Sequence, residues 1–168
     1  MWIPKRALLA ASLVAVAALS LSLAVVAFGD HGRSRGGSKI EQTLAPSVPT
    51  DPAFHGVTPG GAPWVLRRGD VEISRDRLDL RVRGLVIPTA PGNGTPGPVN
   101  TISASLYCGA DADTAPAATS DQAPISRRGD ARIRDRSFDV PDTCLAPVVL
   151  VHPNGDTTRY IAVEGRRP

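Results

Sequence analysis

Leu78-Asp79-Leu80-Arg81-Val82-Arg83 decides the fold class of this chain, because its apolar and charged residues alternate with a period of two. That period places one face of a β-strand against a core and the other face in water. The run Val71-Glu72-Ile73 precedes it, and Arg75-Asp76-Arg77 lies between the two runs, where a turn is expected. The sequence therefore predicts an antiparallel hairpin over residues 71–83.

Two more segments carry strand patterns. In residues 100–108 apolar side chains alternate with Thr, Ser and Tyr, so Cys108 is expected on the core side. Residues 148–151 and 157–163 flank Asn154-Gly155, a pair favoured in hairpin turns because both turn residues need positive φ. With no helical apolar period after the N-terminal segment, we predict an all-β fold, an antiparallel β-sandwich of the immunoglobulin-like type. A small barrel is the alternative.

The N-terminus has the pattern of an export segment. Met1 to Arg6 is basic, and residues 7–28 form an uncharged, mainly apolar stretch. As a helix this stretch would span roughly 33 Å, which favours a retained membrane anchor. Val25-Val26-Ala27 instead offers a cleavage site for a signal peptide. We expect residues 1–28 to be one or the other.

The rest of the chain divides into a linker and one domain. Residues 29–61 are rich in Gly, Ser and Pro without a sustained apolar period, which predicts a flexible linker. Residues 62–165 are long enough for a single β-domain, with Trp64 expected in its core.

Cys108 and Cys144 are the only cysteines of the chain. An even pair in a chain with an export segment predicts one disulfide, which would stabilise the fold by about 4 kcal/mol. A metal pair or a catalytic thiol would need His or Cys partners, and none lies beside either cysteine in the sequence. We therefore expect a protein that is secreted or anchored to the outer face of the cytoplasmic membrane.

Charge and aromatic content exclude some classes of function. The chain has 19 Lys and Arg against 16 Asp and Glu, and Lys5 and Arg6 belong to the N-terminal segment. Aromatic residues make up 4% of the chain, and the core needs most of them, so too few remain to stack on bases or sugars. We expect no nucleic-acid partner. The alternating Arg and Asp of the strands predict a solubilising face, or alternatively a partner-binding face.

No catalytic, cofactor-binding or metal site is predicted. His152 is the only histidine of the predicted domain, and as a general base it would need a nucleophile within about 3 Å that the sequence does not place. Arg68-Gly69-Asp70 and Arg128-Gly129-Asp130 spell the tripeptide that integrins recognise, but we interpret both as turns of a repeated hairpin.

The loop from Pro88 to Pro98, with Asn93 near its centre, is a candidate binding loop. Its length and its Pro and Gly content are typical of functional loops, and the alternative is a disordered crossover between sheets.

Three segments carry a resemblance to known proteins: Ala62-Pro63-Trp64-Val65-Leu66, the run from Val99 to Cys108, and the run from Cys144 through Leu-Ala-Pro-Val-Val-Leu-Val-His-Pro-Asn to Gly155. They resemble an uncharacterised group of small exported, β-rich proteins of GC-rich, mainly actinobacterial, bacteria. The resemblance covers about residues 62–165. It implies an exported β-domain and supplies no catalytic residue.

These observations give a leading hypothesis and an alternative. The first is an exported, non-enzymatic protein without a cofactor that binds an unknown partner, or is structural, at the cell envelope or outside it. A retained N-terminal segment would attach it to the membrane through residues 7–28. The alternative is an extracellular hydrolase, or an inhibitor of an extracellular enzyme, in which His152 or the Pro88–Pro98 loop acts.

Overall fold

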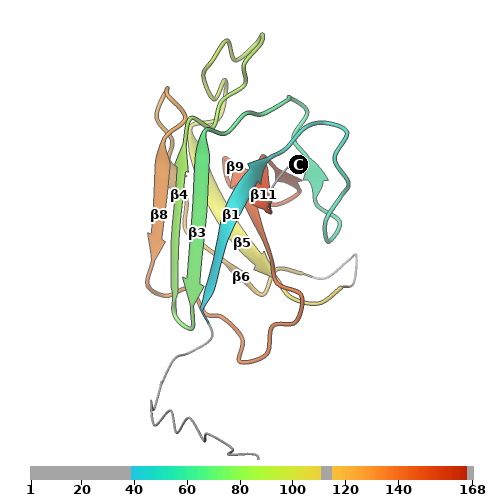
Figure 1. The fold of residues 1–168 in the computed structure, drawn as a ribbon, viewed down its shortest axis with the longest axis vertical. Helices are drawn as coiled ribbons and strands as arrows, with labels where there is room; N and C mark the ends of the chain where they lie inside the picture. The colour runs from blue at the N-terminus through green and yellow to red at the C-terminus, as the bar shows by residue number, and fades with distance from the viewer. Residues whose placement is uncertain (1–38, 111–114, 166–168) are drawn as a thin grey trace, which may run out of the picture. The chain divides into compact units, whose positions relative to one another are not determined.

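The computed structural model describes residues 39–110 and 115–165, and these form β-strands without a helix. Most strands belong to one curled antiparallel sheet, a half-barrel, so the prediction of an antiparallel all-β fold is confirmed (Figure 1). The predicted export segment, residues 1–28, lies outside the described residues. Within the described ranges, no helix has the length and apolar character needed to cross a membrane.

The order of the strands leaves the sheet open on one side. Hydrogen-bonded neighbours follow the order β6–β5–β9–β11–β1–β3–β4–β8, and β7 also pairs with β5. Strand β8 therefore ends the sheet on one side, and β6 and β7 end it on the other. A separate pair, β2 with β10, is parallel. The strands are β1 (Ile40–Pro46), β2 (Thr58–Pro59), β3 (Arg68–Ser74), β4 (Arg77–Arg83), β5 (Thr101–Tyr107), β6 (Ala118–Thr119), β7 (Ala123–Pro124), β8 (Ala131–Asp135), β9 (Val148–Pro153), β10 (Arg159–Tyr160) and β11 (Ala162–Glu164).

Strands β3 and β4 form the hairpin predicted over residues 71–83. Val71 lies opposite Leu80 and Ile73 opposite Leu78, and all four side chains are buried. Across the core, the alternating residues Ile102, Ala104 and Leu106 of β5 are also buried and pack in the same cluster, together with Trp64. The period-two pattern thus fixes which faces of β3, β4 and β5 meet in the core.

The predicted linker of residues 29–61 is wrong from residue 40 onward. Strand β1 pairs with β3 through residues 40–43 and with β11 through residues 44–46, so it joins the two halves of the sheet. Leu44 and Ala45 are each only 7% exposed. The sequence does not predict this strand, because its few apolar residues do not alternate with Glu, Gln, Thr and Pro at a period of two. The folded domain is therefore longer at its N-terminal end than residues 62–165.

Residues 47–61, which we call the strap, pack on the outer side of β5 and β9. Val57 is buried in a second apolar cluster with Tyr107, Leu150 and Tyr160. The His55 ring stacks on Tyr107 with centroids 5.0 Å apart, and Phe54 meets Tyr160 edge to face at 5.6 Å. Contacts with two strands far away in sequence hold the strap in place.

The Asn154-Gly155 turn has the predicted backbone but a different role. Both residues have positive φ, 50° and 74°. They do not close a two-residue hairpin, however, because β9 pairs with β11 and residues 154–161 lie between the two strands. The Asn154 side chain instead accepts hydrogen bonds from the backbone N–H groups of Asn100, at 2.8 Å, and Thr101, at 3.2 Å. The turn therefore ties the end of β9 to the start of β5.

Cys108 and Cys144 form the predicted disulfide, with Cα atoms 4.9 Å apart. The bond joins the end of β5 to the long connection between β8 and β9. A disulfide of this kind is consistent with an oxidising, extracellular environment.

Candidate functional site

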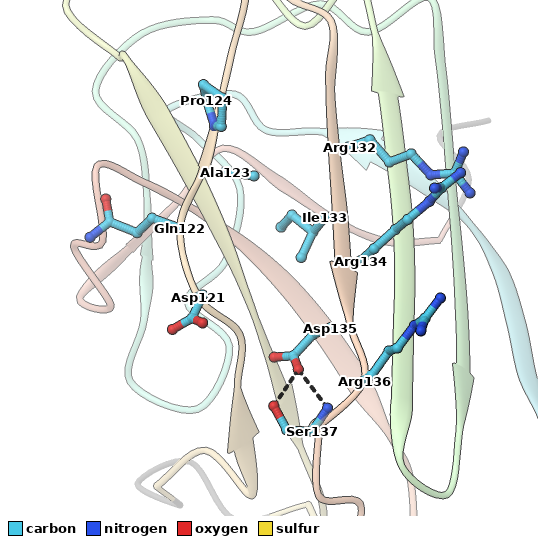
Figure 2. Close-up of a pocket in the computed structure, with 10 residues that line it drawn as sticks. All are labelled: Asp121, Gln122, Ala123, Pro124, Arg132, Ile133, Arg134, Asp135, Arg136 and Ser137. Carbon is cyan, nitrogen blue, oxygen red and sulfur yellow. Dashed lines mark hydrogen bonds between the residues drawn. The ribbon is translucent and has the colours of Figure 1, made fainter.

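The outer surface of β4 and β8 concentrates arginine. Alternation along the two strands turns the apolar side chains inward and the charged ones outward. Figure 2 shows Arg132, Arg134 and Arg136 on one side of β8, with Ile133 and Asp135 on the other. We call the exposed cations of this surface the arginine face; they are Arg77, Arg81, Arg83, Arg132, Arg134 and Arg136.

The register of the sheet brings like charges together on this surface. Arg81 lies opposite Arg132, and Arg68 lies opposite Arg83. Like charges directly opposite each other in an antiparallel pair are destabilising, by about 0.2–1 kcal/mol. The same register also places Asp70 opposite Arg81 and Asp79 opposite Arg134, so carboxylates of β3 and β4 offset part of this repulsion.

Asp79 is the only acidic residue of β4, and it neutralises part of the arginine face. Its Oδ1 accepts a hydrogen bond from Arg132 Nε at 3.1 Å, and its Oδ2 accepts one from Arg132 Nη2. Arg134 Nε lies 3.7 Å from the same Oδ2. Within the described part of the chain, the other members, Arg77, Arg81, Arg83 and Arg136, make no ion pair. Two of the six cations of the arginine face therefore pair with Asp79, and Asp70 of β3 lies opposite a third, Arg81.

The carboxylates of β1 and β3 form ion pairs with cations outside the arginine face. Lys39 Nζ lies 3.2 Å from Glu41 and 3.3 Å from Glu72, and hydrogen bonds to these two carboxylates raise the pKa of Lys39. Arg68 Nε donates to Asp70 Oδ2 at 2.8 Å, and this hydrogen bond raises the pKa of Arg68. Because these acids have their own partners, the unpaired positive charge stays over β4 and β8.

Three hollows of the surface meet at Arg132. The largest, about 710 Å³, lies between β7 and β8 and has Ala123, Pro124 and Ile133 in its lining (Figure 2). Two others, of about 290 Å³ and 190 Å³, lie over the outer surface of the sheet and also share Asp79. The arginine face is thus grooved, and the hollow with the largest volume of these three borders β8.

A second candidate site is a pair of buried polar side chains, Ser103 of β5 and His152 of β9. The register places Ser103 directly opposite His152. His152 Nδ1 is 2.7 Å from the Arg159 carbonyl oxygen, which can only accept, so Nδ1 carries the hydrogen. His152 Nε2 and Ser103 Oγ are both buried without a hydrogen-bond partner. A hydroxyl and an imidazole with a free acceptor nitrogen therefore face one region of the interior.

Burial keeps this pair away from substrate. His152 is 0% exposed and Ser103 2% exposed. Burial lowers the pKa of His152, which keeps the ring neutral, while the hydrogen bond to Arg159 opposes that shift. The sequence singled out His152 but not Ser103, because only strand register brings these two residues together.

The Pro88–Pro98 loop is ordered and projects beyond the ends of the strands (Figure 1). Asn93 N–H donates to the Thr89 carbonyl at 2.9 Å, and Gly94 N–H donates to the Ile87 carbonyl at 2.8 Å. Pro88, Asn93 and Pro98, the residues of the candidate binding loop, are all exposed. They share one loop and are not part of the arginine face.

The two Arg-Gly-Asp copies are not equivalent. Gly69 lies within β3 and is buried, so the turn interpretation is wrong for the first copy, whose Arg68 and Asp70 pair with each other. In the second copy Gly129 does sit in a turn, with φ of 76°, and Asp130 Oδ1 accepts from Gly84 N–H at 3.0 Å. Only the first copy is followed by a paired hairpin, so the expectation of a repeated hairpin is also wrong.

Among the described residues, no group of three or more His, Cys, Asp and Glu side chains is placed so that it could bind a metal ion. No protein-family model, curated protein or solved structure matches the chain. What fold and site define together is a disulfide-bonded all-β domain with an arginine-rich sheet surface.

Proposed function

We propose that the protein is an exported, non-enzymatic β-domain that binds an anionic partner at the cell envelope or outside it, through the arginine face. The observation that carries the proposal is the set of six exposed arginines on or just after β4 and β8, of which, among the described residues, only Arg132 and Arg134 pair with a carboxylate, that of Asp79. Guanidinium groups donate paired hydrogen bonds to carboxylates and phosphates, and these charge-assisted bonds are stronger than neutral ones. An anionic partner would also relieve the repulsion between Arg81 and Arg132, which lie opposite each other.

The expected location is secreted or attached to the outer face of the cytoplasmic membrane. The Cys108–Cys144 disulfide, the apolar stretch of residues 7–28 and the resemblance to small exported proteins of GC-rich bacteria support it. We assign the fold to the immunoglobulin-like sandwiches, and the passage of β1 from β3 to β11 supports two sheets that share one strand.

The partner is expected to be recognised by charge rather than by stacking. Among the described residues the exposed large hydrophobic side chains are Val65 and Leu145, and neither is aromatic. Binding of nucleic-acid bases or sugar rings relies on exposed aromatic rings. We therefore expect no partner that is held by stacking, such as single-stranded nucleic acid.

Binding of model polyanions tests the proposal. We expect the oxidised full-length protein to bind poly-glutamate or polyphosphate and not an uncharged polymer, with affinity falling about tenfold between 50 and 200 mM salt, as for a few released counterions. Replacing Arg132 and Arg134 by Gln should weaken binding about tenfold. The matched control replaces Arg75 and Arg159 by Gln, because these are two exposed arginines outside the arginine face and each has one ion pair. An equal loss in both variants, or no binding of either polyanion, would refute the proposal.

A hydrolase is the second candidate, and the placement of Ser103 opposite His152 is the observation that favours it. It would require the strap or the Arg159 segment to move, because both side chains are buried. Replacing Ser103 by Ala separates the two functions. Binding of polyanions should be unchanged if the arginine face is the site, whereas any esterase or peptidase activity of the wild-type protein would disappear if Ser103 were the nucleophile.

A further inference from the structure

Strand β8 is an open edge next to the hollow of about 710 Å³. It ends the order of paired strands, and its hydrogen-bonded neighbour is β4 on one side alone. Throughout residues 39–110 and 115–165, no backbone hydrogen bond joins residues 131–135 to β7. The outward-facing peptide groups of β8 therefore have no strand partner, and such an edge is a template for another strand.

The hollow exists because two arms of a turn separate. Ser126 N–H donates to the Asp130 carbonyl at 2.9 Å, and Gly129 N–H donates to the Ser126 carbonyl at 2.8 Å, so the chain reverses as in a hairpin. On either side of that turn, β7 pairs with β5 and β8 pairs with β4, so β7 and β8 do not pair with each other. We call the gap between β7 and β8 the seam. It is the place where the curled sheet stays open.

The two sides of the seam differ in chemistry. Ala123, Pro124 and Ile133 form the apolar part of its lining, and Asp121 and Asp135 add carboxylates at one end (Figure 2). On the outward side, Arg132, Arg134 and Arg136 follow one another at alternate positions (Figure 2). Alternate positions on a strand are about 6.6–6.8 Å apart. An added strand would repeat the same spacing, with every second side chain facing the arginines.

We propose that the seam receives an extended acidic segment of a partner protein, which pairs with β8 as an added strand and directs its carboxylates to Arg132, Arg134 and Arg136. This inference rests on the proposed function and names the partner's chemistry. An edge strand presents backbone N–H and C=O groups at the repeat of a polypeptide, which polyphosphate or an acidic polysaccharide does not match. Main-chain hydrogen bonds give such complexes their affinity, and alternate side chains give them their specificity.

The partner segment is defined by this geometry. Acidic residues should occur at every second position over about five residues, the length of β8. The residues between them should be small and apolar, because they face Ala123, Pro124 and Ile133. A Pro at a position that must donate to β8 would prevent pairing.

Two peptides and one inorganic polymer test the inference on the oxidised full-length protein. The first peptide alternates Glu and Ala over ten residues. The second has the same sequence with three alternate backbone nitrogens methylated, so that it keeps every charge and loses main-chain donors. The third probe is polyphosphate. Affinities are measured by fluorescence anisotropy, and exchange of the backbone amide hydrogens of residues 131–135 is measured by mass spectrometry with each probe bound.

The inference expects the unmodified peptide to bind at least about tenfold more tightly than its methylated form, since backbone pairing is lost in the latter. It also expects exchange in β8 to slow with the unmodified peptide and not with polyphosphate. Equal binding of the two peptides, or binding of polyphosphate alone, would refute strand addition and leave the anion-binding function standing. Binding of none of the three probes would refute both proposals.

Discussion

At the scale of single residues, Gly129 shows how one backbone position can hold two strands together. Its φ is 76°, and a Cβ built there would lie 2.4–2.6 Å from backbone atoms of Leu85. The Leu85 N–H donates to the Gly129 carbonyl at 2.9 Å. The turn before β8 therefore packs directly on the end of β4, and only glycine leaves room for that contact.

Replacing Gly129 by Ala should therefore lower the free energy of unfolding by more than the strain of a positive φ would cause alone. We expect a loss of about 3 kcal/mol or more, because both the φ strain and the backbone clash must be relieved. Gly94→Ala is the matched control: its φ of 82° is similar, but nothing lies within 4 Å of the added Cβ. That variant should lose only about 1 kcal/mol. Urea unfolding measures both, and equal losses would show that Leu85 does not limit the turn.

His152 makes a second prediction at this scale, through pH. Burial lowers the folded-state pKa of His152 below the value of about 6.5 expected in the unfolded chain. The unfolded state then takes up a proton before the folded state does as the pH falls. The stability contributed by the neutral ring is therefore complete above pH 6.5 and is lost as the pH falls from there toward the lower folded-state value.

The variant His152→Gln should remove this part of the pH dependence. The wild-type free energy of unfolding should fall between pH 7.5 and 5 more steeply than that of the variant. Glu164, whose pKa is raised by burial, has the opposite effect and is present in both proteins, so it cancels in the difference. Denaturant titrations at several pH values give both curves. Parallel curves would mean that His152 does not stay neutral in the folded protein.

At the scale of elements, the Cys108–Cys144 disulfide fixes a long connection that has little regular structure. It ties the segment between β8 and β9 to the end of β5, and Gly109 N–H donates to the Leu145 carbonyl at 2.6 Å beside it. The partners are 36 positions apart in sequence. Closing a loop of that length removes much of the freedom of the unfolded chain.

Loss of the disulfide should lower the free energy of unfolding by about 4 kcal/mol. Cys108→Ser and the double variant Cys108→Ser/Cys144→Ser should lose the same amount, because either removes the bond. Reductant should bring the wild-type protein down to the level of the variants and leave the variants unchanged. A variant that is as stable as the oxidised wild-type protein would contradict the prediction.

Strand patterns in the sequence are informative where apolar and polar residues alternate. The faces of β3, β4 and β5 follow directly from that period, although the polar face of β5 is itself buried. Strand β1 was missed because its buried residues, Leu44 and Ala45, are adjacent and belong to a strand that changes partners midway. The pairing of Ser103 with His152, and of Arg81 with Arg132, depends on register between distant strands, which no local pattern encodes.

At the scale of the whole molecule, charge is distributed unevenly although its sum is small. The formal net charge of the chain is +3, yet six exposed arginines gather on or just after β4 and β8. A small net charge argues against a protein that binds nucleic acid through its overall charge. It does not say how the charges are distributed over the surface. The alternation of Arg and Asp suits a solubilising face equally well, and only the pairing of β4 with β8 shows that the arginines of these two strands lie on one surface.

The two halves of the molecule depend on β1, which leads to the last prediction. Residues 40–43 cover the edge of β3 and residues 44–46 cover the edge of β11, so loss of this strand exposes both edges and the cavity left by Leu44. A chain that begins at Ser47 should therefore fail to fold or should aggregate through these edges. A chain that begins at Lys39, directly before β1, should melt within a few degrees of the full-length protein. Thermal melts followed by circular dichroism compare the two, and a cooperative melt at the full-length temperature for the chain that begins at Ser47 would show that the fold does not need β1.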